Sequence, residues 1–213
     1  MNETASPRSE AKAVRRQALL DAAAALFAAQ GFAGVSLDDL GAAVGVSGPA
    51  IYRHFSGKQA VLGALLVGVS EELLTGGSRA AGLAPGGEAD DGGTSLRALV
   101  AFHVDFALSK PDVIRVQDRD FTSLSPEDQN AVRTLQLAYV DVWVEALRRL
   151  QPEASRAELR LRAQAVFGLI NSTPHSVGRT RRDGGRVPAA PARKLLESMA
   201  LAALTAPSAT PSS

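Results

Sequence analysis

The sequence predicts an all-helical protein with a small N-terminal domain and a larger C-terminal domain. Hydrophobic residues make up 46% of the 213 residues and aromatic residues only 5%, so leucine, alanine and valine supply most of the apolar surface. These apolar residues recur three or four positions apart over long stretches, which is the period of a helix with a buried face. The chain shows no β-hairpin signal and no internal repeat.

The first two predicted helices are bounded by glycines and by a capping serine. The first begins near Ser9 and ends at Gln30-Gly31, because glycine readily adopts the left-handed conformation that follows a helix. Ser36 is expected to open the second helix, since Asp39 three positions later can complete a capping box. Gly45 then ends this helix.

A third helix is predicted from Ser47, which suits the N-cap, through Pro49, whose missing N–H costs little in a first turn. Ile51 and Phe55 lie four positions apart and can face a small core together, which leaves Arg53 pointing outward. Two short helices joined by a glycine turn have the layout of a helix-turn-helix, whose second helix enters the major groove of DNA.

The remaining chain is predicted to form further helices. A fourth starts near Gly57-Lys58, and the glycine- and acid-rich stretch 76–93 after it is expected to be a long flexible loop. The strongest later start signal is Ser125-Pro126-Glu127-Asp128, and the helix that it opens is apolar on two faces, as expected of a helix buried between neighbours. The later predicted helices cover 94–109, 111–122, 125–150, 155–174 and 190–205. The predicted domains are 11–57 and 58–205, with flexible tails at 1–10 and 206–213.

Composition excludes several kinds of site. The chain has no cysteine, so it holds neither disulfides nor thiolate metal sites. No apolar run approaches the roughly 18 residues needed to span a bilayer, and residues 1–9 lack the apolar segment of a secretory signal. We therefore expect a cytoplasmic protein with no metal and no cofactor. The net charge of +1 does not by itself identify a nucleic-acid binder.

Catalysis is not expected of this chain. The three histidines are far apart, and the sequence contains no His-Glu-x-x-His, no Gly-x-Gly-x-x-Gly and no Gly-Lys-Ser/Thr phosphate loop. His103 and Asp105 are two positions apart on a predicted helix, so their side chains point to different faces.

A set of motifs between residues 11 and 66 is shared with one known family. They are Gly31-Phe32, Ser36, Asp39-Leu40, Val44-Gly45-Val46-Ser47, Tyr52-Arg53-His54-Phe55 and Lys58. With this spacing the segment resembles the DNA-binding domain of the TetR family of bacterial transcriptional repressors. The resemblance implies a homodimeric repressor on a palindromic DNA operator, released by a small-molecule effector bound in the C-terminal domain. The alternative is a TetR-like activator, or a regulator without a small-molecule inducer.

The resemblance also implies a role for each residue of the motif. Phosphate contacts are expected from Ser36, Tyr52, His54 and Lys58, and also from Ser47, which caps the recognition helix. Base contacts are expected from Gly48, Pro49, Ala50 and Arg53. Because Gly48 offers no side chain, reading falls to Arg53 on guanine and to Pro49 and Ala50 beside thymine methyls. The basic side chains expected near phosphates or the minor groove are Arg8, Lys12, Arg15 and Arg16. Taken alone, Tyr52 favours core packing, and His54 favours a surface position or that of a histidine with its hydrogen bonds satisfied.

The last two long helices, near 156–174 and 190–205, are implied to pair with those of a second copy as a four-helix bundle. The apolar residues expected at this interface are Leu159, Ala163, Val166, Ile170, Leu195, Leu196, Met199 and Ala203. Packing within one chain is the alternative role for the same residues.

A ligand pocket is implied between the helices of the C-terminal domain. Its candidate lining residues are Phe102, His103, Phe106, Ile114, Gln117, Phe121, Tyr139, Trp143, Phe167, Asn171 and His175. Few polar groups accompany these aromatic residues, so an apolar or amphipathic ligand is expected rather than a charged one. Asn171, His103 and His175 are the candidate polar anchors, and ordinary core packing is the alternative for the whole set.

Overall fold

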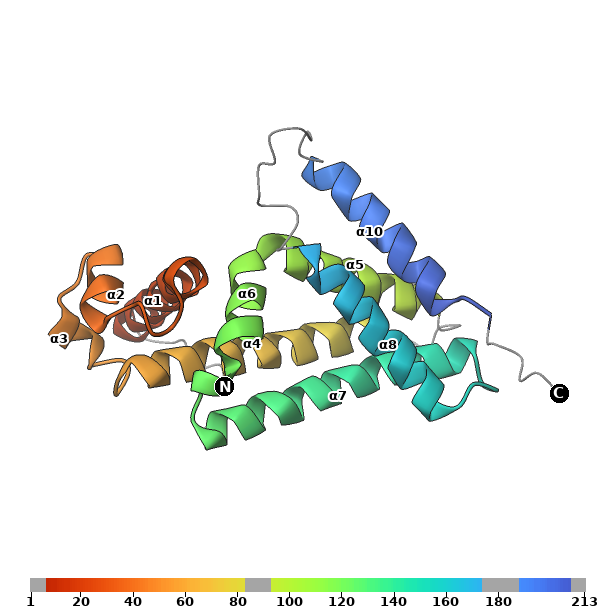
Figure 1. Ribbon diagram of the computed structural model, residues 1–213, viewed down its shortest axis with the longest axis horizontal. Helices are drawn as coiled ribbons and strands as arrows, with labels where there is room; N and C mark the ends of the chain where they lie inside the picture. Colours follow the sequence, from red (N-terminus) through yellow and green to blue (C-terminus); the bar gives the residue numbers. More distant parts are fainter. Residues whose placement is uncertain (1–6, 83–92, 174–187, 208–213) are drawn as a thin grey trace.

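A computed structural model describes residues 7–82, 93–173 and 188–207, and every regular element in these ranges is helical. A small group formed by α1 to α3 lies at one end of the molecule, and α4 runs from it into a larger group formed by α5 to α10 (Figure 1). The elements are α1 (Pro7–Gln30), α2 (Leu37–Ala43), α3 (Gly48–Ile51), α4 (Lys58–Ala80), α5 (Gly93–Ser109), α6 (Pro111–Asp120), η1 (Phe121–Ser123), α7 (Pro126–Leu150), α8 (Arg156–Asn171) and α10 (Ala189–Leu204).

The predicted helix starts are confirmed at three serines. Ser36 and Asp39 form the full capping box at the start of α2, each side chain bonding the backbone N–H of the other residue. Ser125 and Ser155 cap α7 and α8 by accepting the backbone N–H three residues later. The glycines that end α1 and α2, Gly31 and Gly45, have φ values of 83° and 70°, the left-handed conformation that only glycine adopts without strain.

Two helix ends differ from the prediction. Helix α3 stops at Ile51, and Tyr52 caps it, so residues 52–54 form a turn instead of a further helical turn. Helix α4 continues through Gly76 and Gly77 to Ala80, although these glycines are where the flexible loop is predicted to begin; residues 83–92 of that stretch lie outside the described ranges.

The two glycines stay helical because aromatic rings lie against them. A Cβ atom on Gly76 would come within 2.3 Å of the Phe102 ring, and one on Gly77 within 2.3 Å of the Tyr139 ring. Such a contact is far inside van der Waals distance, so only glycine lets α4 approach α5 and α7 this closely. Tertiary packing here outweighs the low helix propensity of glycine.

Two hydrophobic cores lie along α4. The N-terminal core joins the buried faces of α1 to α4, and it also contains Val113 and Val116 of α6 and Val132 of α7. The C-terminal core joins α5, α7, α8 and α10, and Val69 of α4 packs against both cores. Helix α4 is long and apolar enough to cross a membrane by composition alone, but here it is packed among α1, α5 and α7. The N-terminal helices are therefore built onto the C-terminal domain rather than linked to it loosely.

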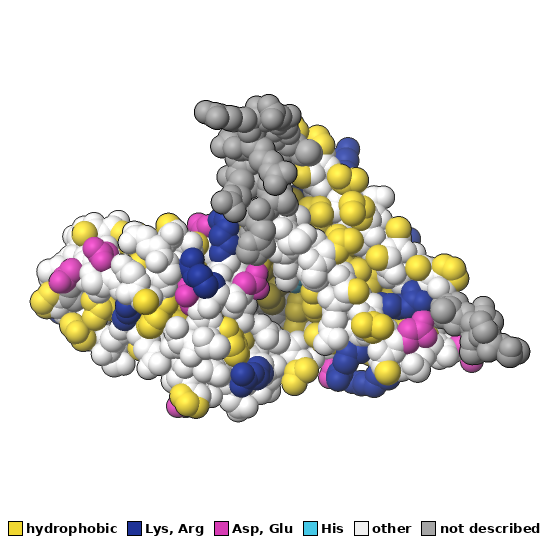
Figure 2. Space-filling view, in the orientation of Figure 1, with side chains coloured by type: hydrophobic (Ala, Val, Ile, Leu, Met, Phe, Trp, Pro, Cys, Tyr) yellow, Lys and Arg dark blue, Asp and Glu magenta, His cyan; other side chains and the backbone are white. Residues whose placement is uncertain are grey.

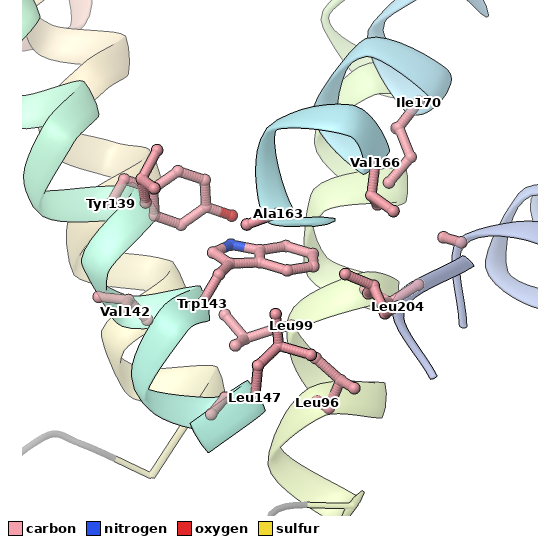
Figure 3. Packing of buried hydrophobic residues seen from close by; sticks show 14 of the residues in the cluster. Leu96, Leu99, Tyr139, Val142, Trp143, Leu147, Ala163, Val166, Ile170 and Leu204 are labelled. Atoms are coloured by element: carbon pink, nitrogen blue, oxygen red, sulfur yellow. The ribbon is translucent and has the colours of Figure 1, made fainter. Parts of the chain in front are cut away.

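Trp143 lies at the centre of the C-terminal core. Its indole ring is fully buried among side chains from α5, α7, α8 and α10, including Leu99, Ala163 and Leu204 (Figure 3). The expectation that α7 is buried between neighbours is confirmed for most of its apolar residues. Those that are buried are Val132, Tyr139, Val140, Val142, Trp143, Val144, Ala146 and Leu147. Leu137 is the exception, with 53% of its surface exposed.

The packing of α8 corrects the predicted dimer face. Leu159, Ala163, Val166 and Ile170 belong to the protomer's own core and are at most 1% exposed, so a second copy cannot reach them. The alternative role, packing within one chain, therefore applies to these four residues. On α10 the position is different: Leu195, Met199 and Ala203 are exposed and Leu196 is half-buried.

Candidate DNA-binding face and ligand pocket

The turn that follows α3 carries two exposed side chains at the end of the molecule. Tyr52 is 60% exposed, and Arg53 is exposed beside it. No hydrogen bond or ion pair joins the Arg53 guanidinium to any other described residue. The hydroxyl of the exposed ring and the solvated cation beside it are both accessible, so the pair is suited to contact with a polyanion.

The other expected base-reading positions are also on this face. Pro49 is exposed in the first turn of α3 and Ala50 is half-buried; Gly48 has no side chain to describe. Ser47 is exposed and has the backbone conformation of an N-cap, but its hydroxyl makes no capping hydrogen bond. The Ser47 hydroxyl therefore does not cap α3, whereas the Ser36 hydroxyl caps α2.

The Ser36 hydroxyl is engaged within the domain. It donates to Asp39 Oδ2 at 2.6 Å while accepting the Asp39 backbone N–H at 3.1 Å. Hydrogen bonds from the Ser36 hydroxyl and backbone lower the pKa of the Asp39 carboxyl, so this carboxylate is charged at neutral pH. A phosphate at Ser36 would have to compete with Asp39 for the hydroxyl proton.

Lys58 is engaged as well, at the start of α4. Its Nζ donates to the backbone oxygens of Phe32 at 2.8 Å and Val35 at 2.7 Å, and it lies 4.5 Å from the centre of the Phe32 ring. Both carbonyls belong to the loop between α1 and α2. Lys58 therefore ties this loop to α4 and leaves one N–H for a phosphate.

His54 and three basic residues of α1 are the other residues expected to contact DNA. His54 is half-buried, and its Nδ1 atom is buried without a hydrogen-bond partner. Lys12, Arg15 and Arg16 are exposed, and the Arg16 guanidinium stacks 4.8 Å from the centre of the Phe55 ring. The side chain of Arg8 lies outside the described part of the chain.

A cavity of about 490 Å³ opens between α4, α5, α7 and α8 in the C-terminal domain. It is lined by Leu73, His103, Arg133, Gln136, Leu137, Tyr139, Val140, Gln164, Phe167 and Asn171. Four of the sequence candidates are therefore brought together here: His103, Tyr139, Phe167 and Asn171.

The other candidates do not line this cavity. Trp143 and Phe106 stand behind its wall, 5.9 and 6.1 Å from the His103 ring centre, and Phe102 packs on Gly76. Gln117, Ile114 and Phe121 belong to the α6–η1 segment, away from the lining, and His175 lies outside the described residues. The remaining lining residues, among them Gln136, Leu137 and Gln164 at the mouth of the cavity, are not among the candidates from the sequence. The one sequence signal for any of them is the apolar stripe of α7 that includes Leu137 and Val140.

Aromatic rings form the inner wall of the cavity around His103. The rings of Tyr139 and Phe167 are stacked at 5.5 Å and 4° apart, and the His103 ring lies 4.9 Å from that of Phe167. Burial lowers the pKa of His103 to about 4, against a smaller opposing effect of the Asn171 side chain, so the imidazole is neutral at pH 7. Burial also raises the pKa of the Tyr139 hydroxyl, which therefore keeps its proton.

Two family models match the sequence. One, described as "Bacterial regulatory proteins, tetR family", matches residues 19–65, and the other, "Tetracyclin repressor-like, C-terminal domain", matches residues 90–175. The first covers the candidate DNA-binding face and the second most of the cavity. No curated protein matches the chain in sequence.

Solved structures share the fold. The TetR family transcriptional regulator PfmR from Thermus thermophilus is 24% identical, with a TM-score of 0.70 over 87% of this chain and 96% of its own. The fatty acid degradation regulator FadR from Bacillus halodurans is 16% identical, with a TM-score of 0.67 over 96% and 98%. AibR, solved with isovaleryl coenzyme A and operator DNA, is 19% identical, with a TM-score of 0.67 over 87% and 97%. At these identities the likeness is one of fold.

Proposed function

Because this chain belongs to the TetR family of bacterial transcriptional regulators, we propose that it is a homodimeric repressor of the cytoplasm, without catalytic activity. It binds a palindromic operator through α3 and the turn that follows it. A small apolar or amphipathic ligand in the cavity of the C-terminal domain releases the DNA. Coupling of this kind is typically about 1–3 kcal/mol and is reciprocal, so operator DNA weakens ligand binding by the same factor.

The single observation that carries the proposal is the pair of Tyr52 and Arg53, exposed at the end of α3 with no described partner for the guanidinium. In this role Tyr52 contacts a phosphate and Arg53 reads a base edge. Ser47, whose hydroxyl is not used in capping, adds a donor to the backbone beside them.

An exposed apolar surface on α8 and α10 supports the homodimer. Leu161 is 66% exposed, Leu195 56% and Met199 45%, and the small residues Ala165 and Gly168 are exposed on α8 as well. Hydrophobic side chains gather over these two helices (Figure 2). Large apolar side chains beside small ones are typical of helices that pack against a second copy. A two-fold dimer would place its recognition helices about 34–36 Å apart, which matches a palindrome.

Two proteins of the same fold support a ligand-controlled regulator. AibR was solved with both an acyl coenzyme A and operator DNA, and KstR2 of Mycobacterium tuberculosis is described as a ketosteroid transcriptional regulator. By analogy, this chain would bind both operator DNA and a small molecule. The cavity beside His103, with its aromatic wall, is where this chain would bind its effector.

DNA binding by purified protein tests the proposal. DNA enriched from a random pool and a scrambled control are compared by fluorescence anisotropy for the wild type, Tyr52→Ala, Arg53→Ala and the control Arg148→Ala, which removes an exposed charge near the end of α7. Tyr52→Ala should weaken binding to both DNAs, whereas Arg53→Ala should reduce the preference for the enriched DNA about ten-fold or more. Wild-type affinities for both variants would refute the assignment.

The dimer is tested by Leu195→Glu, which should give a monomer in sedimentation because it places a charge in the apolar surface. Thr134→Glu adds the same charge to an exposed position of α7, and this variant should sediment with the mass of a dimer. If the Leu195→Glu variant is still a dimer, the dimer interface does not include this surface of α10.

A further inference from the structure

Two buried polar atoms of the cavity lining have no hydrogen-bond partner, His103 Nε2 and Asn171 Oδ1. His103 is only 3% exposed, and the Asn171 side chain lies close enough to the imidazole to affect its protonation. The geometry of a direct hydrogen bond between the two is nevertheless not met. A buried polar group without a partner is unfavourable, so the pair marks a place where another molecule can bond.

The proton on His103 can be placed from its other contact. Tyr139 Oη lies 3.2 Å from His103 Nδ1, and no other acceptor for the hydroxyl is found among the described residues. This buried hydroxyl keeps its proton and has Nδ1 as its one described acceptor, so we place the hydroxyl as the donor and Nδ1 as the acceptor of this bond. The imidazole is neutral and carries a single proton, which is therefore on Nε2.

The unpaired atoms are thus a donor and an acceptor. His103 Nε2–H offers a proton, and Asn171 Oδ1 can receive one. A ligand hydroxyl satisfies both, because its oxygen accepts from Nε2–H while its own proton goes to Oδ1. A carboxylate has no proton to give to Oδ1, and an ether or a hydrocarbon satisfies one of the two atoms at most.

The surroundings of the pair favour a neutral and apolar ligand. The stacked rings of Tyr139 and Phe167 form the wall beside His103, and burial in this wall is unfavourable for an anion. The cation of the lining is Arg133, an exposed residue whose guanidinium lies 5.0 Å from the centre of the Phe121 ring and bonds Gln129 at 3.4 Å. Phe121 belongs to η1 and Gln129 to the first turn of α7, so these contacts hold the guanidinium toward the start of α7 rather than toward Tyr139.

We propose that the effector is a neutral hydroxyl compound on an apolar, ring-bearing skeleton, a phenol or an alcohol, whose hydroxyl bridges His103 Nε2–H and Asn171 Oδ1. The inference rests on the proposed function for the regulatory meaning of the cavity. The recognition chemistry itself depends only on the lining residues, so it can be tested without DNA.

Three probes of one shape test the bridge: 4-propylphenol, its methyl ether 4-propylanisole, and 4-propylbenzoate. Binding is measured at neutral pH by calorimetry, and the fluorescence of Trp143, the chain's only tryptophan, reports whether the probe occupies this cavity. The wild type should bind the phenol about ten-fold more tightly than the ether, the factor expected when one buried hydrogen bond is lost, and should bind the benzoate most weakly.

Variants assign the preference to the two atoms. Asn171→Leu and His103→Phe should bring the phenol-to-ether ratio close to one while the ether still binds. The control Asn130→Leu, which makes the same replacement at an exposed position of α7 outside the lining, should keep the wild-type ratio. Far-ultraviolet dichroism checks that each variant is folded.

Several outcomes would overturn the inference. A wild type that binds the ether as tightly as the phenol would mean that no ligand hydroxyl is read, as when a trapped water holds the bridge. Tightest binding of the benzoate would assign recognition to Arg133, and no binding of any probe would reject the ligand class. Each of these leaves operator binding intact in the anisotropy assay, whereas loss of sequence-specific DNA binding would reject the proposed function instead.

Discussion

Replacing Lys58 by methionine should destabilise the DNA-binding domain without removing any apolar core residue. The lysine joins the start of α4 to the loop between α1 and α2 through its bonds to the carbonyls of Phe32 and Val35, and its charge lies over the Phe32 ring. Methionine keeps much of the aliphatic length but donates no hydrogen bond, so it leaves both carbonyls without this partner.

The structure sets the size of the effect. A hydrogen bond from a charged donor contributes about 1.5–3 kcal/mol, and the half-buried position of Lys58 reduces this through competition with water. For the two bonds together we expect a loss of about 2 kcal/mol in the free energy of unfolding, close to a thirty-fold change in the folded-to-unfolded ratio.

Urea unfolding followed by far-ultraviolet dichroism measures this loss. The matched control is Lys12→Met, which removes the same charge from an exposed position of α1 where the lysine has no described hydrogen bond. We expect the control to stay within about 0.5 kcal/mol of the wild type. If Lys58→Met is as stable as the control, the two carbonyl bonds do not hold the loop and the reasoning fails.

The same variant separates the structural role of Lys58 from its predicted contact with phosphate. A lost phosphate contact lowers the slope of log affinity against log salt by about one, whereas a merely loosened loop changes affinity without changing the slope. Because the ammonium keeps one N–H beyond the two carbonyls, we expect the slope to fall. An unchanged slope would leave Lys58 with the structural role alone.

Three further predictions concern the contacts between helices. Gly77→Val should cost several kcal/mol, because its Cβ would fall within 2.3 Å of the Tyr139 ring, and calorimetric melting would show this; an unchanged melting temperature would contradict the close approach. Arg119→Met should lower stability by about 1–2 kcal/mol, since the guanidinium bonds the Phe27 carbonyl at the end of α1, and urea unfolding with no measurable loss would count against that contact. Burial lowers the pKa of His103 from 6.5 to about 4, so the unfolded chain takes up the proton first as pH falls; the wild type should therefore lose about 2 kcal/mol more than His103→Phe between pH 7 and pH 4.5, and equal losses would disprove the buried neutral histidine.

The parts of the fold that the sequence predicts are those determined locally. Ser36 and Asp39 form a capping box because both partners lie within one turn, and Gly31 and Gly45 end helices because their own backbone conformation requires glycine. Tyr52 and Arg53 are exposed, as expected for residues next to a short helix with only Ile51 and Phe55 turned inward.

The parts that the sequence does not predict depend on distant residues. Gly76-Gly77 reads as a break, yet it stays helical because Phe102 and Tyr139 pack on it from other helices. Helix α8 has apolar residues on two faces, and periodicity cannot tell which face enters the protomer's own core; Leu159 does, while Leu161 is exposed.

The residues that line the cavity also fall into those that the sequence predicts and those that it does not. Its aromatic inner wall could be predicted only in part, because the sequence does not separate His103, Tyr139 and Phe167 from the other aromatic candidates, such as Trp143, which do not line the cavity. Its polar mouth could not, since Gln136 and Gln164 look like ordinary exposed positions until α7 and α8 are packed together.

The central claim is that the chain is a sequence-specific DNA-binding regulator, and one measurement tests it most directly. The affinity of the purified protein for DNA enriched from a random pool is compared with its affinity for a scrambled sequence at about 0.15 M salt, because phosphate contacts make both values salt-dependent. We predict at least about 10³-fold tighter binding to the enriched DNA, the low end for specific regulators. Equal and weak binding to both, with no sequence enriched from the pool, would contradict the claim.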